Sequence, residues 1–254
     1  MRLDELKIIV TGAASGMGKH FALRFAEAGA RVVASDVNES ALNALVQESS
    51  DLAGEVFAVP CDVSQEAQVV SLVDRAFKAM GGLNALVNNA GIFRDSLLVK
   101  KGKDGEVRKM SMDDWNAVIG VDLTGPFLCT REFAGKLLET DSKPGVVVNI
   151  SSVSRHGNMG QSNYSAAKAG LVADTRLWGS ELARYGIRVG AIAPGFIDTP
   201  ILQGMRPEVL GKVLQGVPLR QAGQCEEIFL GAKFIIECDY FTGRCLDIDG
   251  GLNL

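Results

Sequence analysis

The sequence predicts an α/β fold in which a parallel sheet is covered by helices on both faces. Short apolar runs and longer amphipathic segments alternate along the whole chain, with no linker or internal repeat between them. Strands connected through helices pair in parallel by right-handed crossovers. The chain has 254 residues, of which 47% are hydrophobic, and this suits one core of ordinary domain size. We therefore expect a single domain over residues 1–254.

Seven apolar runs are the expected strands. They lie near residues 6–11, 31–35, 55–60, 84–88, 145–151, 187–193 and 244–248. Helical segments separate them, and two long helices are expected around residues 113–138 and 161–184. A basic, glycine-containing insertion at residues 100–109 follows the fourth strand, and its composition is typical of a solvated loop.

A glycine-rich turn joins the first expected strand to the first helix. It has the sequence Thr11-Gly12-Ala13-Ala14-Ser15-Gly16-Met17-Gly18. Glycines let the backbone approach a ligand closely, and the free amides at a helix N-terminus favour a pyrophosphate. An ordinary turn would not need three glycines between a buried strand and an amphipathic helix. The turn therefore predicts a dinucleotide site.

Asp36 ends the second expected strand, at a position suited to the adenosine ribose. Its carboxylate can accept hydrogen bonds from both ribose hydroxyls and would repel a 2′-phosphate. No Arg or Lys lies in the glycine turn or just after Asp36 to offset that charge. These residues favour NAD(H) over NADP(H). The alternative is that Asp36 caps the helix that begins near Glu39.

Tyr164 and Lys168 are four residues apart in a segment expected to be helical, so both lie on one face. A phenol beside an ammonium ionises more readily, because the cation stabilises the phenolate. We expect Tyr164 to exchange a proton near neutral pH. A solvent-exposed pair is the alternative when these two residues are considered alone.

Together these motifs resemble the short-chain dehydrogenase/reductase family, over essentially the whole chain. The resemblance is carried by Gly12, Gly16, Gly18, Asn88-Asn89-Ala90-Gly91, Ser152, Tyr164, Lys168 and Pro194-Gly195. The segment 160–170 is most similar to bacterial 3-oxoacyl-thioester reductases and related ketone reductases. It implies a Rossmann-type doubly wound sheet and an NAD(P)(H)-dependent interconversion of a ketone and a secondary alcohol. The expected substrate is a 3-oxoacyl thioester of CoA or acyl-carrier protein, or its 3-hydroxyacyl form.

The resemblance also implies roles for individual residues around the cofactor. The phosphate turn would consist of Gly12, Ser15, Gly16, Met17 and Gly18, and the adenine would contact Asp62 and Val63. The cofactor would also be lined by Asn89, Ala90 and Gly91, and its nicotinamide amide would be held by Pro194, Gly195, Ile197 and Thr199. Simpler roles exist for some of these residues. Asp62 can cap the helix after Ser64, and Asn88, Asn89 and Pro194-Gly195 are typical of turns.

For catalysis, the resemblance implies that Ser152 and Tyr164 bind the substrate carbonyl, while Lys168 holds the nicotinamide ribose and stabilises the phenolate. Ser151 is the alternative to Ser152, because adjacent strand residues point to opposite sides. Asp122 occupies a position where the family has Asn. A carboxylate near Lys168 would raise the pKa of the phenol, so we expect an active enzyme with a shifted pH optimum.

Two surface segments complete the functional prediction. Residues 196–216 resemble the substrate lid of the family, and the lysines of the insertion at 100–109 would meet CoA phosphates if it binds substrate.

The two long helices would pair with those of other subunits in a homotetramer. Burial within one chain is the alternative explanation for their large apolar residues, which are Trp115, Phe127, Phe133, Leu171 and Trp178.

Composition narrows the classes of function that remain possible. No apolar stretch is long enough for a membrane span, and the net charge of -4 gives no reason to expect nucleic acid as a partner. The five cysteines are scattered and odd in number, as expected for reduced thiols of a cytoplasmic protein. With only His20 and His156, we expect no histidine metal site. The rival functions are reduction of a small ketone, sugar or hydroxy acid, and nucleotide sensing with weakened catalysis.

Overall fold

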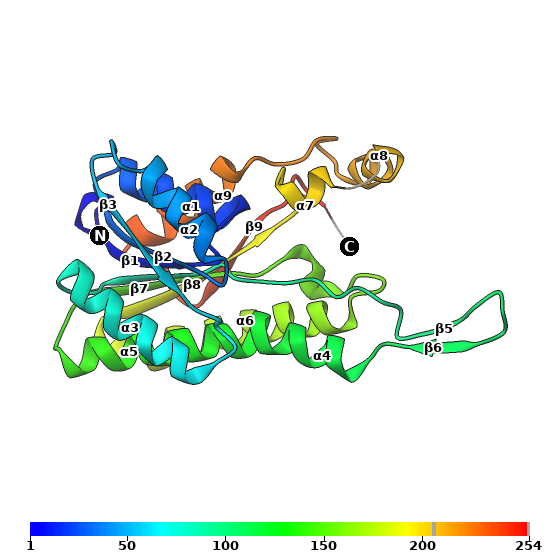
Figure 1. Ribbon diagram of the computed structural model, residues 1–254, viewed down its shortest axis with the longest axis horizontal. Helices are drawn as coiled ribbons and strands as arrows, with labels where there is room; N and C mark the ends of the chain where they lie inside the picture. The colour runs from blue at the N-terminus through cyan, green and yellow to red at the C-terminus, as the bar shows by residue number, and fades with distance from the viewer. Residues whose placement is uncertain (205–206, 253–254) are drawn as a thin grey trace.

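The computed structural model describes residues 1–204 and 207–252, and it confirms the predicted α/β fold (Figure 1). One sheet of seven parallel strands has the order β3-β2-β1-β4-β7-β8-β9. The strands are β1 (Lys7–Thr11), β2 (Arg31–Asp36), β3 (Glu55–Pro60), β4 (Ala85–Asn88), β7 (Gly145–Ile150), β8 (Ile187–Pro194) and β9 (Arg244–Ile248). Each lies where an apolar run predicted a strand.

Helices cover both faces of the sheet (Figure 1). One layer contains α1 (Gly16–Glu27), α2 (Glu39–Glu48) and α9 (Cys225–Glu237). The other contains α3 (Glu66–Met80), α4 (Met112–Ile119), α5 (Gly125–Glu139) and α6 (Ser162–Glu181). Successive strand residues point to opposite layers, so Ile8 and Val10 enter the core beside α1 while Ile9 enters the core beside α3. For this reason, strands that are buried on both faces have nearly continuous runs of apolar residues in the sequence.

The strand order reverses between β1 and β4. The chain adds β2 and β3 on one side of β1, then returns to place β4, β7, β8 and β9 on the other side. In open α/β sheets, the connections after the two central strands diverge at such a point and leave a crevice at their carboxyl ends. The glycine turn after β1 and the segment after β4 both end in this crevice.

The long helix predicted over residues 113–138 is interrupted. A π-helical turn, Gly120–Thr124, separates α4 from α5, and Pro126 lies in the first turn of α5. Proline is tolerated there because the first amides of a helix have no carbonyl partner within it. A π-helical turn inserts one extra residue into the helix and rotates the following side chains. It places Asp122 in the interior, where its exposed fraction is 0%.

The insertion at residues 100–109 is solvent-exposed, as expected for a solvated loop, and it forms a β-hairpin that its composition did not predict. β5 (Val99–Lys101) and β6 (Val107–Lys109) pair antiparallel and project from the body of the molecule (Figure 1). The turn closes through a hydrogen bond from the Gly102 amide to the Glu106 carbonyl, and Gly105 has a φ of 84°. Glycine adopts this left-handed conformation without strain.

The remaining helices are short. The 3-10 helices are Leu3–Glu5, Val153–His156 and Ala183–Tyr185, and the segment expected as a lid contains α7 (Pro200–Gln203) and α8 (Pro207–Gly216). Residues 205–206 of that lid lie outside the described part of the chain. None of the described helices combines the length and apolar character needed to cross a bilayer.

Substitution of Leu72 by Ala tests the packing of α3 on the sheet. Leu72 is 1% exposed, so its loss should lower the free energy of unfolding by about 2–5 kcal/mol. Val70→Ala on the same helix removes a side chain that is 40% exposed, and it should change the free energy of unfolding by less than about 0.5 kcal/mol. Urea unfolding of both variants measures the difference. Equal effects would contradict the placement of α3.

Candidate active site

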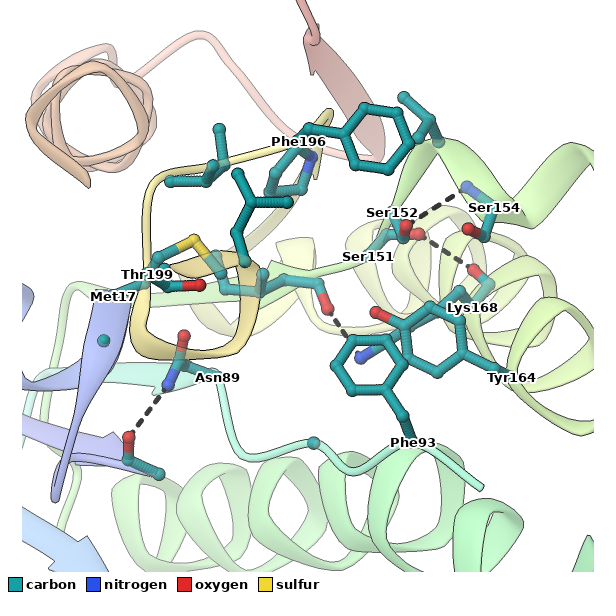
Figure 2. A pocket seen from close by; sticks show the side chains of 18 of the residues that line it. Met17, Asn89, Phe93, Ser151, Ser152, Ser154, Tyr164, Lys168, Phe196 and Thr199 are labelled. Atoms are coloured by element: carbon teal, nitrogen blue, oxygen red, sulfur yellow. Dashed lines mark hydrogen bonds between the residues drawn. The ribbon is translucent and has the colours of Figure 1, made fainter. Parts of the chain in front are cut away.

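A cavity of about 420 Å³ opens at the carboxyl ends of the strands (Figure 2). Most of the residues predicted for a site line it. They are Gly12, Ser15, Gly16, Met17, Asp36, Asn89, Gly91, Ser152, Tyr164, Lys168, Pro194, Gly195, Ile197 and Thr199. The other predicted residues are outside its lining, and they are Gly18, Asp62, Val63, Ala90 and Asp122.

The glycine turn packs too tightly for larger residues. A Cβ atom on Gly12 would lie 2.7 Å from the Cα atom of Ala90, and one on Gly18 would lie 2.1 Å from the carbonyl oxygen of Gly12. Gly16 is restricted by its backbone instead, since its φ is 53° and a Cβ atom there would make an ordinary contact with Thr199 at 3.6 Å. The side chain of Ser15 does not cap α1, so the first-turn amides remain available to a ligand. This cradle fits a pyrophosphate.

Asp36 lies at the wall of the cavity and braces the glycine turn. Its Oδ2 accepts a hydrogen bond from the Ala14 amide at 3.1 Å, and its Oδ1 accepts one from the Asn38 amide at 3.0 Å. The cap of α2 is Asn38, whose side chain accepts from the Ala41 amide. The alternative role of Asp36 as the cap of that helix is therefore wrong.

Asp62 and Val63 lie in the turn after β3. The Asp62 carboxylate accepts hydrogen bonds from the Ser64 amide at 3.0 Å and the Ser64 hydroxyl at 2.7 Å. Val63 is 5% exposed, and a Cβ atom on Gly125 would lie 2.8 Å from it. Asp62 thus closes the turn between β3 and α3 and does not cap α3, whose N-cap is Gln65, so the simpler interpretation of Asp62 as a helix cap is wrong. The contact of Asp62 and Val63 with adenine stays a prediction.

Ser151 and Ser152 follow β7 and differ in their partners (Figure 2). Ser151 is 2% exposed, and its hydroxyl donates to the Lys168 carbonyl at 2.9 Å. The Ser152 hydroxyl accepts from the Ser154 amide at 3.1 Å and lowers the pKa of Tyr164 through hydrogen bonding. Ser151 therefore holds the backbone of α6, whereas the Ser152 hydroxyl is directed at the phenol.

Tyr164 and Lys168 share one face of α6, as their spacing predicts. The Lys168 Nζ atom lies 5.3 Å from the centre of the Tyr164 ring and donates to the Ile150 carbonyl at 3.1 Å. Phe93 covers the phenol ring, with 4.5 Å between the ring centres (Figure 2). Phe93 comes from the segment after β4, so residues on two sides of the crevice enclose the phenol.

Asp122 lies beneath the cavity and pairs with Lys168. Its Oδ2 atom is 3.1 Å from Lys168 Nζ but accepts no hydrogen bond, so this contact is an ion pair without hydrogen-bond geometry. Its Oδ1 atom accepts from the Ile92 amide at 2.9 Å. Gly91 has to be glycine at this point, because a Cβ atom would lie 2.8 Å from Asp122 Oδ2.

Burial dominates the ionisation of this cluster. The pKa of Tyr164 is raised, chiefly by burial, with a further increase from Asp122 and an opposing effect of Lys168. Burial also raises the pKa of Asp122. Burial lowers the pKa of Lys168, but the charges of Asp122 and Tyr164 outweigh it and leave that pKa raised. Lys168 lowers the phenol pKa, as expected, but burial outweighs this effect, so the expected net shift toward neutrality is wrong.

Several residues that line the cavity were not predicted from the sequence. They are Phe93, Asp95, Asn158 and Gln161, whereas Phe196 and Leu202 lie in the segment 196–216 that was expected as a lid. Phe93 and Asp95 follow β4 at its carboxyl end, where ligands bind in α/β sheets, and this position was the available signal. His156, in the short helix after Ser152, is exposed and does not line the cavity.

The comparisons with known proteins identify the family. The family model for short chain dehydrogenases matches residues 7–209. The chain is 40% identical to a 3-oxoacyl-(acyl-carrier-protein) reductase of Thermotoga maritima, over 99% of both chains. It is 36% identical to a (3R)-3-hydroxyacyl-CoA dehydrogenase of Canis lupus familiaris, over 99% of this chain and 98% of the relative.

The solved structures agree with this assignment. A 7α-hydroxysteroid dehydrogenase complexed with NADH and 7-oxo glycochenodeoxycholic acid superimposes with a TM-score of 0.90 at 32% identity. The match covers 99% of this chain and 96% of that chain. The protein therefore belongs to the short-chain dehydrogenase/reductase family and is an oxidoreductase of that family.

Substitution of Lys168 by Met tests the buried ion pair without reference to turnover. The Asp122 carboxylate would remain buried without its cation, so we expect a loss of about 3–5 kcal/mol in the free energy of unfolding. The loss should shrink as pH falls, because protonation removes the unpaired charge. The double variant Lys168→Met/Asp122→Asn should recover most of it. Additive losses in urea unfolding would contradict the pairing.

Proposed function

We propose that the protein interconverts a 3-oxoacyl thioester of CoA or acyl-carrier protein and its 3-hydroxyacyl form, with NAD(H) as cofactor. The convergence of Ser152, Tyr164 and Lys168 on one end of the cavity carries the proposal. A hydroxyl and a phenol directed at one point can bind a carbonyl oxygen, and a buried ammonium stabilises negative charge on the phenol.

In this mechanism, Ser152 and Tyr164 donate hydrogen bonds to the substrate carbonyl. The nicotinamide supplies or accepts the hydride when it is bound. Tyr164 gives its proton to the oxygen of the forming alcohol, and the charge of Lys168 stabilises the phenolate that remains. Lys168 has three N–H donors, and those not used by Ile150 can hold the nicotinamide ribose. In the direction of alcohol oxidation, Tyr164 accepts the proton.

The preference for NAD(H) over NADP(H) rests on Asp36. Its carboxylate lies in the cavity wall, where it can accept hydrogen bonds from ribose hydroxyls and repel a 2′-phosphate. The pyrophosphate would be held by the amides of the glycine turn and of the first turn of α1. In the described part of the chain, no Arg or Lys side chain lines the cavity next to Asp36.

The acyl chain would lie against the apolar side chains of Phe93, Phe196 and Leu202. Leu202 belongs to α7, and its position in the lining supports a role of segment 196–216 as a substrate lid. Both relatives compared above have names that specify 3-oxoacyl or 3-hydroxyacyl thioesters, which supports the substrate class. The exposed cations of the β5–β6 hairpin would meet the phosphates of the carrier group.

A homotetramer would use the outer surface of α5 and α6. Phe133 and Leu171 are fully buried within one chain, so they cannot form an interface. Phe127, Leu138 and Leu177 are 43%, 45% and 52% exposed, and these side chains remain available for contacts between subunits.

Substitution of Tyr164 by Phe tests the proposed reaction. With acetoacetyl-CoA, loss of the phenolic proton donor should lower kcat by roughly 100- to 10,000-fold. Turnover is followed by nicotinamide absorbance with NADH and with NADPH, and NADH should give the higher kcat/KM. Tyr240→Phe is the matched control, because Tyr240 is fully exposed. Absence of thioester reduction despite NADH binding would reject the proposed substrate, and tighter binding of NADPH would reject the cofactor preference.

Substitution of Asp122 by Asn tests the influence of the ion pair on the phenol. The charged groups around Tyr164 are Lys168, Asp122 and Asp95, and Ser152 contributes a hydrogen bond. Removal of the Asp122 charge leaves Lys168 opposed only by the smaller effect of Asp95, so the pKa of Tyr164 should fall. The pH profile of kcat for oxidation of a 3-hydroxyacyl thioester should then move toward lower pH. An unchanged profile would mean that Asp122 only supports the fold.

A further inference from the structure

The charges in the cavity are unequally distributed. Among the described residues that line it, the ionisable side chains other than Tyr164 are Asp36, Asp95 and Lys168. The Lys168 ammonium is already paired with the buried carboxylate of Asp122. The described lining therefore offers two carboxylates and no unpaired cation. Such a wall has nothing to neutralise a carboxylate on a substrate.

Asp95 is held in place by a relay of side-chain amides. Gln161 Nε2 donates to Asp95 Oδ2 at 2.9 Å, and Asn158 Nδ2 donates to Gln161 Oε1 at 3.0 Å. The backbone is fixed as well, since the Ser96 amide donates to the Gly160 carbonyl at 2.9 Å. Gln161 is 8% exposed, whereas Asp95 is exposed at the edge of the cavity. The protein thus positions a solvated carboxylate at the cavity entrance.

Asp95 acts on the reacting end of the cavity. Its charge contributes to the raised pKa of Tyr164, so it lies within electrostatic range of the phenol. Phe93, two residues earlier in the chain, packs on the phenol ring at 4.5 Å between the ring centres. Asp95 and Tyr164 line the same cavity, so the substituents of a carbonyl bound by Tyr164 share that cavity with the Asp95 carboxylate.

We infer that Asp95 is a specificity-determining residue that excludes substrates carrying a carboxylate next to the reacting ketone and admits neutral thioesters and esters. In a free 3-oxo acid, one methylene group separates the carboxylate from the ketone, so both groups would enter this part of the cavity. A thioester has the same skeleton without the charge. The inference deepens the proposed function, since it selects acyl thioesters over small hydroxy acids and oxo acids.

The test compares acetoacetate with ethyl acetoacetate, which differ in charge at one end. Wild-type protein should favour the ester in kcat/KM, and Asp95→Asn should reduce that preference about tenfold, corresponding to about 1.4 kcal/mol. The gain should fall on acetoacetate, with the ester changed less than about twofold. Affinity for both compounds in the NADH complex, from nicotinamide fluorescence, gives the same comparison without turnover. The wild-type preference should also weaken at high salt, because salt screens exposed charges.

Two further variants serve as controls. Asn still accepts the hydrogen bond from Gln161, and Asp95→Glu keeps the charge and should keep the preference for the ester. Asp51→Asn makes the same change of net charge at the opposite edge of the sheet and should leave the preference unchanged. An equal preference in wild type and Asp95→Asn, by kcat/KM and by affinity, would overturn the inference. If the preference depends on Asp95 but acetoacetyl-CoA is not reduced, the charge filter stands and the proposed thioester substrate fails.

Discussion

Asn89 joins the two halves of the crevice through its side-chain amide. Its Nδ2 group donates to the carbonyls of Thr11 and Gly12 at 3.0 and 3.1 Å, so the end of β4 is fixed against the turn after β1. Gly12 has to lack a side chain because the backbone of Ala90 lies in the position of its Cβ atom. Where the amides of α1 point, and how deep the cavity is, both depend on this close contact between two loops.

A second constraint is the burial of the charged Lys168 side chain, since this residue is only 3% exposed. The ammonium needs partners because burial of a single charge costs several kcal/mol. Asp122 supplies a counter-ion and Ile150 a carbonyl, while the π-helical turn brings Asp122 into position. The Asp122 charge also raises the pKa of the phenol, against the opposing effect of Lys168, so the counter-ion of the buried lysine shifts the protonation of the residue beside it.

Buried amides connect these parts to the sheet. Asn88 Nδ2 donates to Thr130 Oγ1 at 3.0 Å and to Asn149 Oδ1 at 2.8 Å, and Asn149 Nδ2 donates to Thr175 Oγ1 at 2.9 Å. These bonds link β4, β7, α5 and α6 behind the cavity. The sequence suggested only that Asn88 closes a turn, since nothing local to it identifies partners some 40 to 60 residues away.

The local sequence pattern was sufficient to predict the strands and the glycine turn. It failed for features that depend on tertiary contacts. Apolar runs bounded by glycine and proline predicted all seven strands of the main sheet, and the spacing of Tyr164 and Lys168 placed both on one helix face. The π-helical turn at Asp122 has no distinct residue pattern, and the hairpin was hidden by its lysines. The raised pKa of the phenol depends on burial, which a pair of residues read alone does not reveal.

The two ends of the cavity differ in how they interact with negative charge. Backbone amides determine this interaction at one end, and a side chain determines it at the other. At the glycine turn, uncapped amides and the dipole of α1 favour an anion without any lysine or arginine in the described lining. At the entrance beside Tyr164, the Asp95 carboxylate repels one. A phosphate-bearing cofactor and a neutral acyl group fit this polarity, whereas a cofactor and substrate that are both anionic at the reacting end would not. The cavity thus orients its ligands by charge as well as by shape.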